Sequence, residues 1–162
     1  MNPYLPYFFG PQADYYLRAA EDVQERKIQF NGIAFLAGIL WMGYRKMYWQ
    51  AFLTAAIIFG QNLLEAMLWG PRNPNDNSSV IISLLANAVI GFISNQMYVK
   101  FANRQINKIL SEHAGASEER LIELISEKGG VTWFGPFIVL TVIFIGAAFL
   151  LMFAEMAGIK LT

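Results

Sequence analysis

Residues 131–154 read VTWFGPFIVLTVIFIGAAFLLMFA, a run of 24 residues without a charged side chain. An α-helix rises about 1.5 Å per residue, so a helix of this length extends about 36 Å. The hydrocarbon core of a bilayer is only about 30 Å thick. The run therefore predicts a membrane-spanning helix, which we place at residues 133–156.

Three further uncharged runs precede it, at residues 29–44, 47–64 and 80–99. The last two are long enough to span, and the apolar pattern of the run at 47–64 continues to Trp69. The apolar centre of the first, residues 32–43, is too short, because it reaches only about 18 Å as a helix. We expect an all-α membrane protein with three transmembrane helices, at 47–69, 80–98 and 133–156, and a short re-entrant or interfacial helix at 30–43.

The composition agrees with this class and excludes several others. Apolar residues make up 56% of the 162 residues and charged residues only 15%, below the roughly 25% of soluble domains. Twelve basic and twelve acidic side chains cancel, so no net field recruits nucleic acid. The chain has no Cys and one His, which excludes thiolate chemistry and a His cluster. No nucleophile–base pair or phosphate-binding loop is visible, so we expect no catalysis, metal or cofactor.

The distribution of Lys and Arg predicts the orientation, because basic loops stay in the cytoplasm. With three spans, ten basic residues fall on one side of the membrane and two, Arg72 and Lys160, on the other. If residues 30–43 formed a fourth span, the distribution of basic residues would fall to seven on one side against five on the other. We therefore expect residues 1–29 and 99–130 to be cytoplasmic and the C-terminus to lie outside. Tyr and Trp near the span ends, such as Tyr98 and Trp133, fit the headgroup level.

Two cytoplasmic segments have helical patterns. Asp14 is a plausible N-cap for a helix over 14–29, and prolines should keep the preceding aromatic stretch, residues 4–9, extended on the membrane surface or on a partner. Residues 99–130 predict a helical hairpin whose second helix starts at Ser117 and ends at Lys128, before Gly129-Gly130.

The first helix of this hairpin, residues 99–112, carries a basic stripe of Lys100, Arg104 and Lys108. The stripe fits an interfacial helix pressed on anionic lipid headgroups. It fits equally a cytoplasmic extension of the second span with a solvated basic face.

Polar residues inside the spans are candidate functional groups, because burying them in lipid is expensive. Glu65 and Glu155 both fall toward the outer boundary, and Gln61 and Asn62 lie near Glu65 on the same predicted helix. They are either interfacial groups that reach water or an intramembrane site for a proton or cation. In the second span, the polar residues Asn87, Ser94, Asn95 and Gln96 are expected to form hydrogen bonds between helices.

Some residues are not explained by bilayer physics: Asp14-Tyr15-Tyr16, Phe30-Asn31, Ala34-Phe35, Trp41 and Tyr44-Arg45-Lys46-Met47-Tyr48. Together they resemble a bacterial family of small membrane proteins classed as a domain of unknown function, and the resemblance covers about residues 14–49. A later Gly129-Gly130-Val131-Thr132 agrees more weakly, and Gly32 stands where the family usually has Trp. The resemblance implies a bacterial inner membrane location and no particular activity.

The basic pair within this signature predicts a contact at the cytoplasmic turn. We expect Arg45 and Lys46 to anchor the topology by binding lipid phosphate. The alternative is that Arg45 pairs with a helix C-terminus or with an acid of a partner subunit.

These features favour a non-catalytic accessory or scaffold subunit of a larger bacterial membrane complex, in contact with other membrane subunits or with itself. Three spans cannot easily enclose a pathway alone. The alternative function is a small oligomeric ion or proton transporter or channel component that uses Glu65 and Glu155.

Overall fold

The computed structural model describes residues 1–69 and 78–156, apart from the side chains of Glu65, Ala66, Trp69, Ser78, Ser79 and Ala154. Every regular element in this part of the chain is a helix. In order they are α1 (Leu5–Phe9), the 3-10 turn η1 (Gly10–Gln12), α2 (Ala13–Gln24), α3 (Gly32–Ala37), α4 (Ile39–Tyr44), α5 (Tyr48–Trp69), α6 (Ser78–Glu112), α7 (Glu118–Lys128) and α8 (Phe134–Met156). The all-helical expectation is thus confirmed for the described residues.

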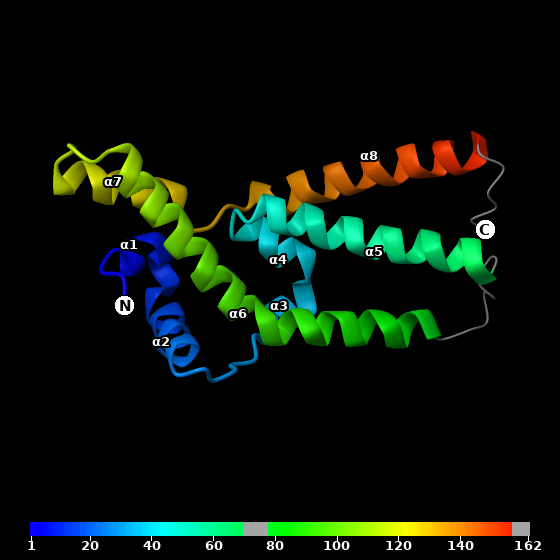
Figure 1. Ribbon diagram of the computed structural model, residues 1–162, viewed down its shortest axis with the longest axis horizontal. Helices are drawn as coiled ribbons and strands as arrows, with labels where there is room; N and C mark the ends of the chain where they lie inside the picture. The colour runs from blue at the N-terminus through cyan, green and yellow to red at the C-terminus, as the bar shows by residue number, and fades with distance from the viewer. Residues whose placement is uncertain (70–77, 157–162) are drawn as a thin grey trace.

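The helices form two ends of an elongated molecule (Figure 1). At one end α5 and α8 pack against each other, and the first half of α6 runs alongside them in the view. At the other end the second half of α6 carries α1, α2 and α7. The short helices join the parts, because α3 packs on α6 while α4 packs on both α5 and α8.

Two helices are long and apolar enough to cross a membrane, over Val80–Glu112 and Phe134–Phe153. Only 22% and 6% of their most apolar windows are buried. The core helix of a soluble protein would instead be buried by its neighbours. The exposed apolar surface of α6 and α8 therefore indicates association with a membrane. The predicted first span corresponds to α5, which has 22 residues but is not one of the two helices that meet this test among the described residues.

The predicted short helix at 30–43 is present as two six-residue helices. The break is at Gly38, whose φ of 52° lies in the left-handed region that favours glycine. Asn31 caps α3, because its Oδ1 accepts a hydrogen bond from the Ala34 N–H at 2.9 Å. The chain thus turns between α3 and α4, which lets the two helices contact different partners.

The prediction for the N-terminal segment is wrong. Residues 4–9 are not extended on the surface, because α1 forms there and buries Leu5, Phe8 and Phe9 almost completely. Pro6 lies in the first turn of α1, where a helix needs no N–H donor, so it does not prevent the helix. The helix expected at 14–29 starts one residue earlier and ends at Gln24, and Asp14 lies in its first turn rather than at its cap.

The segment 99–112 is a continuation of α6, which runs without interruption from Ser78 to Glu112. A separate interfacial helix is therefore not observed. The second helix of the hairpin matches its prediction as α7, where the Ser117 hydroxyl accepts the Arg120 N–H at 3.4 Å. Gly130, which follows α7, adopts the left-handed conformation that favours glycine, with φ 67°.

Glycines at two contacts allow segments far apart in sequence to touch. A Cβ on Gly135, at the start of α8, would lie 2.0 Å from the carbonyl oxygen of Gly43 in α4. A Cβ on Gly129 would lie 2.1 Å from the carbonyl oxygen of Phe8 in α1. In both places the obstacle is backbone, which cannot rotate away. These glycines therefore hold α4 against α8 and α1 against the end of α7.

We predict that Gly135→Ala destabilises the protein by about 1–3 kcal/mol, the usual cost of overpacking a core. The reason is that the added methyl group must push α8 away from the Gly43 carbonyl. The matched control is Gly146→Ala in the same helix, where a Cβ meets nothing within 4 Å. Thermal unfolding in detergent, followed by circular dichroism, should show a lower midpoint for Gly135→Ala only. Equal midpoints would show that the α4–α8 contact is loose.

Candidate functional site

Residues 44–48, which carry much of the resemblance noted above, lie at a junction between the two ends of the molecule. The Tyr44 carbonyl accepts the Thr132 N–H at 2.9 Å, so the end of α4 is bound to the segment before α8. Lys46, with φ 59°, donates from Nζ to the Glu127 carbonyl at 2.8 Å, in the last turn of α7. Met47 is fully buried, whereas Tyr48 is exposed. The pentapeptide therefore connects α4 and α5 to α7 and α8.

Arg45 is the buried centre of this junction, with only 4% of its surface exposed. Its guanidinium carbon lies 4.3 Å from the ring centroid of Tyr16 and 5.1 Å from that of Tyr98. Its Nη2 donates to the Gln12 Oε1. Nε and Nη1 have no hydrogen-bond partner, and no carboxylate pairs with Arg45 among the described residues. Aromatic faces, not an acid, thus surround the cation.

This position differs from the expected contact with lipid phosphate. The bulky side chains of α2 and α6 cover Arg45, so a headgroup cannot reach its guanidinium. It is Lys46, rather than Arg45, that binds a helix C-terminus, where cations are favoured. Partial burial, together with the charge of Lys128, lowers the pKa of Lys46. Burial raises the pKa of Tyr16, and the neighbouring Arg45 opposes that rise.

An aromatic cluster surrounds the junction and joins four helices. Tyr98 of α6 is fully buried, with ring centroids of Tyr16 at 4.8 Å, Phe9 at 5.4 Å and Trp41 at 6.0 Å. Tyr98 therefore contacts other side chains of the protein and does not present its ring to lipid. Its hydroxyl has no hydrogen-bond partner in the described part of the chain. Sequence patterns do not predict this cluster, because Phe9 and Tyr98 are far apart in the chain.

A second buried polar group lies beside α6 and centres on Asn95, which is 3% exposed. Its Oδ1 accepts the Asn31 Nδ2 at 2.9 Å, and its own Nδ2 is 3.0 Å from the Tyr15 hydroxyl and 3.1 Å from the Gln29 Oε1. Asn95 therefore forms the expected hydrogen bonds between segments and ties α2, its following linker and α3 to α6.

The α6 backbone also takes part in this group. The Gly91 carbonyl accepts the Asn31 N–H at 2.9 Å and the Ser94 hydroxyl at 3.3 Å. Ser94 thus bonds within its own helix. Side chains and outside donors that compete for helix carbonyls bend helices, and α6 changes direction between its two halves (Figure 1). Phe30 packs here, since a Cβ on Gly91 would lie 2.5 Å from its ring.

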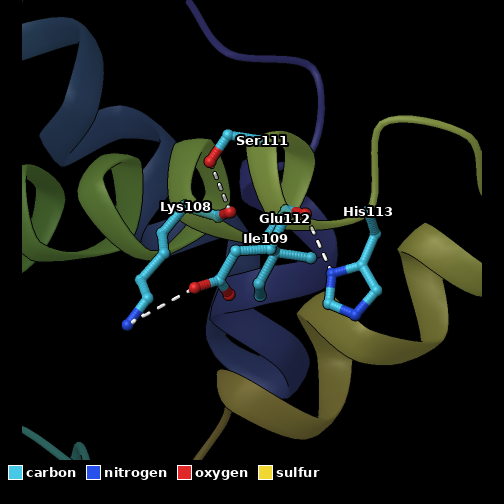
Figure 2. A network of polar contacts seen from close by, with 5 residues as sticks. All are labelled: Lys108, Ile109, Ser111, Glu112 and His113. Atoms are coloured by element: carbon cyan, nitrogen blue, oxygen red, sulfur yellow. Dashed lines mark hydrogen bonds and ion pairs between the residues drawn. The ribbon is translucent and has the colours of Figure 1, made fainter.

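The remaining predicted site residues lie on the surface. Lys100, Arg104 and Lys108 are exposed on the second half of α6. Figure 2 shows two separate contacts: the Lys108 Nζ lies 3.7 Å from the Glu112 Oε1, and the His113 Nδ1 lies 3.1 Å from the Ile109 carbonyl. The stripe is therefore partly neutralised at its end.

The intramembrane candidates are not joined by a described contact. Gln61 and Asn62 are exposed on α5, and Asn62 donates to the Ile58 carbonyl of its own helix at 2.7 Å. Glu155 is exposed on α8, and the side chain of Glu65 lies outside the described residues. No group of three His, Cys, Asp or Glu that could hold a metal occurs in the part of the chain described.

Two of the hollows in the described part of the chain bear on function. An apolar groove of about 800 Å³ runs between α5 and α8, from Tyr48 to Leu63 on one side and from Ile138 to Leu150 on the other. A smaller pocket of about 460 Å³, with polar and apolar walls, lies between α2, its following linker and α6, and Asn95 contributes to its lining.

The fold and the junction define a small all-helical protein in which apolar helices able to cross a membrane are attached to a polar helical end. The chain matches the family described as "Protein of unknown function (DUF2628)" over residues 13–104, more than half of its length, and it belongs to this family. This agrees with the resemblance to an uncharacterised family. No curated protein and no solved structure matches the chain.

We predict that Asn95→Ala lowers stability by about 1–3 kcal/mol, because it leaves buried partners such as Asn31 without a hydrogen bond. The control is Asn103→Ala on the same helix, since Asn103 donates only to the Val99 carbonyl of that helix. Thermal unfolding of both variants in detergent measures the difference. A midpoint for Asn95→Ala equal to that of the control would contradict a structural role for this group.

Proposed function

We propose that this chain is a three-span protein of the bacterial inner membrane and acts as a non-catalytic accessory or scaffold subunit of a larger membrane complex. In this proposal α5, the first half of α6 and α8 span the bilayer, and α3 and α4 form a re-entrant or interfacial pair. The N-terminus and residues 99–130 lie in the cytoplasm, and the C-terminus lies outside.

The distribution of exposed side chains supports the membrane placement. Large apolar side chains are exposed along α5, the first half of α6 and α8, and on α6 the last of them is Ile93. Trp49 and Trp133 are exposed at the starts of α5 and α8, where an aromatic belt is expected. The second half of α6 exposes Lys100 and Arg104 instead. The orientation rests on the ten-to-two distribution of basic residues.

The observation that carries the accessory role is the groove between α5 and α8. Its lining covers about four helical turns of α5, roughly 24 Å, which is most of the hydrocarbon thickness. Gly60 and Gly146 line it, and a Cβ on either would meet nothing within 4 Å. Small residues let helix backbones approach closely in lipid. We assign the groove to a transmembrane helix of another subunit.

The transporter alternative gains no support from the described geometry. No contact joins Glu155 to Gln61 or Asn62 among the described side chains, and Asn62 is bonded within its own helix. The groove on the same two helices is almost entirely apolar, which suits a helix better than an ion.

We predict that leucines in the groove displace the partner helix. The double variant Gly60→Leu, Gly146→Leu fills open space, so it should fold normally, yet it should lose a stoichiometric partner after extraction in mild detergent. The control is Gly32→Leu, which also enters open space but lies outside the groove. Native mass spectrometry measures the composition of the complex.

A photo-crosslinker at position 56 tests the contact directly. Ala56 lines the groove, whereas the neighbouring Ile57 is exposed and does not. The proposal is supported if a crosslinker at position 56, but not one at position 57, captures the partner that the double variant loses. A pure homo-oligomer, or a partner retained equally by the double variant and the control, would contradict it.

A further inference from the structure

We propose that the pocket between α2 and α6 binds the headgroup of a phospholipid that carries a primary amine, with its phosphate on Arg26 and its ammonium on Asp22. The pocket has a volume of about 460 Å³ and is lined by both of these residues, together with Gln29, Asn95, Phe92 and Ile93. This inference rests on the proposed membrane placement, because the pocket must lie at headgroup level.

The first argument is that the pocket holds separate charges of both signs. Asp22 and Arg26 are four residues apart, a spacing at which an uninterrupted helix would let them pair. The helix ends before Arg26, which adopts φ 58°, and the two side chains form no ion pair with each other or with another described residue. Lys27 also lines the pocket, and it differs from Arg26 in that its Nζ forms an ion pair with Glu25 at 2.6 Å.

This charge pattern selects the chemistry of the ligand. A free guanidinium is the side chain best suited to phosphate, because it presents several donors in one plane. A free carboxylate beside it repels a purely anionic headgroup and attracts an ammonium group. A headgroup with one phosphate and one amine complements both, and its amine protons can also be accepted by a neighbouring amide such as Gln29.

The second argument is the position of the pocket on α6. Phe92 and Ile93 line it and are exposed, and they are the last large exposed apolar residues of that helix. Asn95 and Gln96, which follow, also line it. Ile28 is exposed at the linker side of the pocket. The walls thus change from apolar to polar where acyl chains meet headgroups, which favours a lipid over a soluble ligand.

The third argument is that the pocket is held in shape by buried polar contacts. Its wall residue Asn95 is fixed by Asn31 at 2.9 Å and by the Gln29 Oε1 at 3.1 Å. The Lys27 N–H donates to the Asp22 carbonyl at 2.8 Å, which fixes the turn after α2. The two charged residues are therefore attached to a constrained framework rather than to a free loop.

The experiment uses the intact chain in nanodiscs that contain equal amounts of phosphatidylethanolamine and phosphatidylglycerol. Lipid retained after brief delipidation is measured by native mass spectrometry. We expect phosphatidylethanolamine to be enriched. Arg26→Gln should reduce its retention on the order of fivefold, which corresponds to the loss of one basic contact with a headgroup. Asp22→Asn should remove the preference for the amine while leaving phosphatidylglycerol bound.

Matched controls are Arg18→Gln and Glu21→Gln, which change exposed charges on α2 outside the pocket. They should retain the wild-type preference. Equal retention of both lipids by the wild type, or equal effects of the pocket and control variants, would overturn the proposal. Displacement of lipid by soluble phosphoethanolamine without any acyl-chain requirement would assign the site to a soluble ligand and would also overturn it. A chain that does not enter the nanodisc at all would refute the membrane placement as well.

Discussion

The burial of the Arg45 guanidinium is the constraint on which the rest of the structure depends. Removing an unpaired cation from water costs free energy, and each contact with an aromatic face offsets only about 0.5–2 kcal/mol of that cost. The cation is therefore stable in place only while Tyr16 and Tyr98 remain over it and the Gln12 Oε1 accepts a hydrogen bond from it. The N-terminal helices must then stay packed on α6, and the apolar contacts of Phe8 and Phe9 with Tyr98 stabilise this packing.

The irregular backbone between α2 and α5 follows from the same docking. In a lipid-facing protein, non-helical backbone is tolerated only where other protein groups satisfy it. The Asn31 N–H is satisfied by the Gly91 carbonyl and the Tyr44 carbonyl by the Thr132 N–H. Both contacts lie between the apolar end of the molecule and its polar end. The break at Gly38 lets α3 pack on α6 while α4 packs on α5 and α8. One short segment therefore fixes the positions of α5, α6 and α8 relative to one another.

Sequence patterns predicted the long helices and α7 well, because length, periodicity and capping are local properties. They drew attention to residues 44–48 but did not predict the contacts of these residues, since Arg45 meets Tyr16 and Tyr98 across long stretches of chain. A basic residue beside a span normally indicates lipid phosphate, and only tertiary packing shows that Arg45 is covered. The helix α1 was missed because proline is compatible with both an extended chain and a first helical turn. Asn95 was recognised as a hydrogen-bonding residue, but its partners in the α2–α3 linker were not.

The central claim is that the exposed apolar surfaces face lipid while the polar end faces water. The chain has no cysteine, so single cysteines report on one position each. Labelling with a membrane-impermeant maleimide should be compared for Phe144→Cys, at an exposed residue of α8, and Arg104→Cys, at an exposed residue of α6. In opened native membranes, Arg104→Cys should react fully and Phe144→Cys only after denaturation. Equal reaction of both cysteines in undenatured membranes would contradict the account.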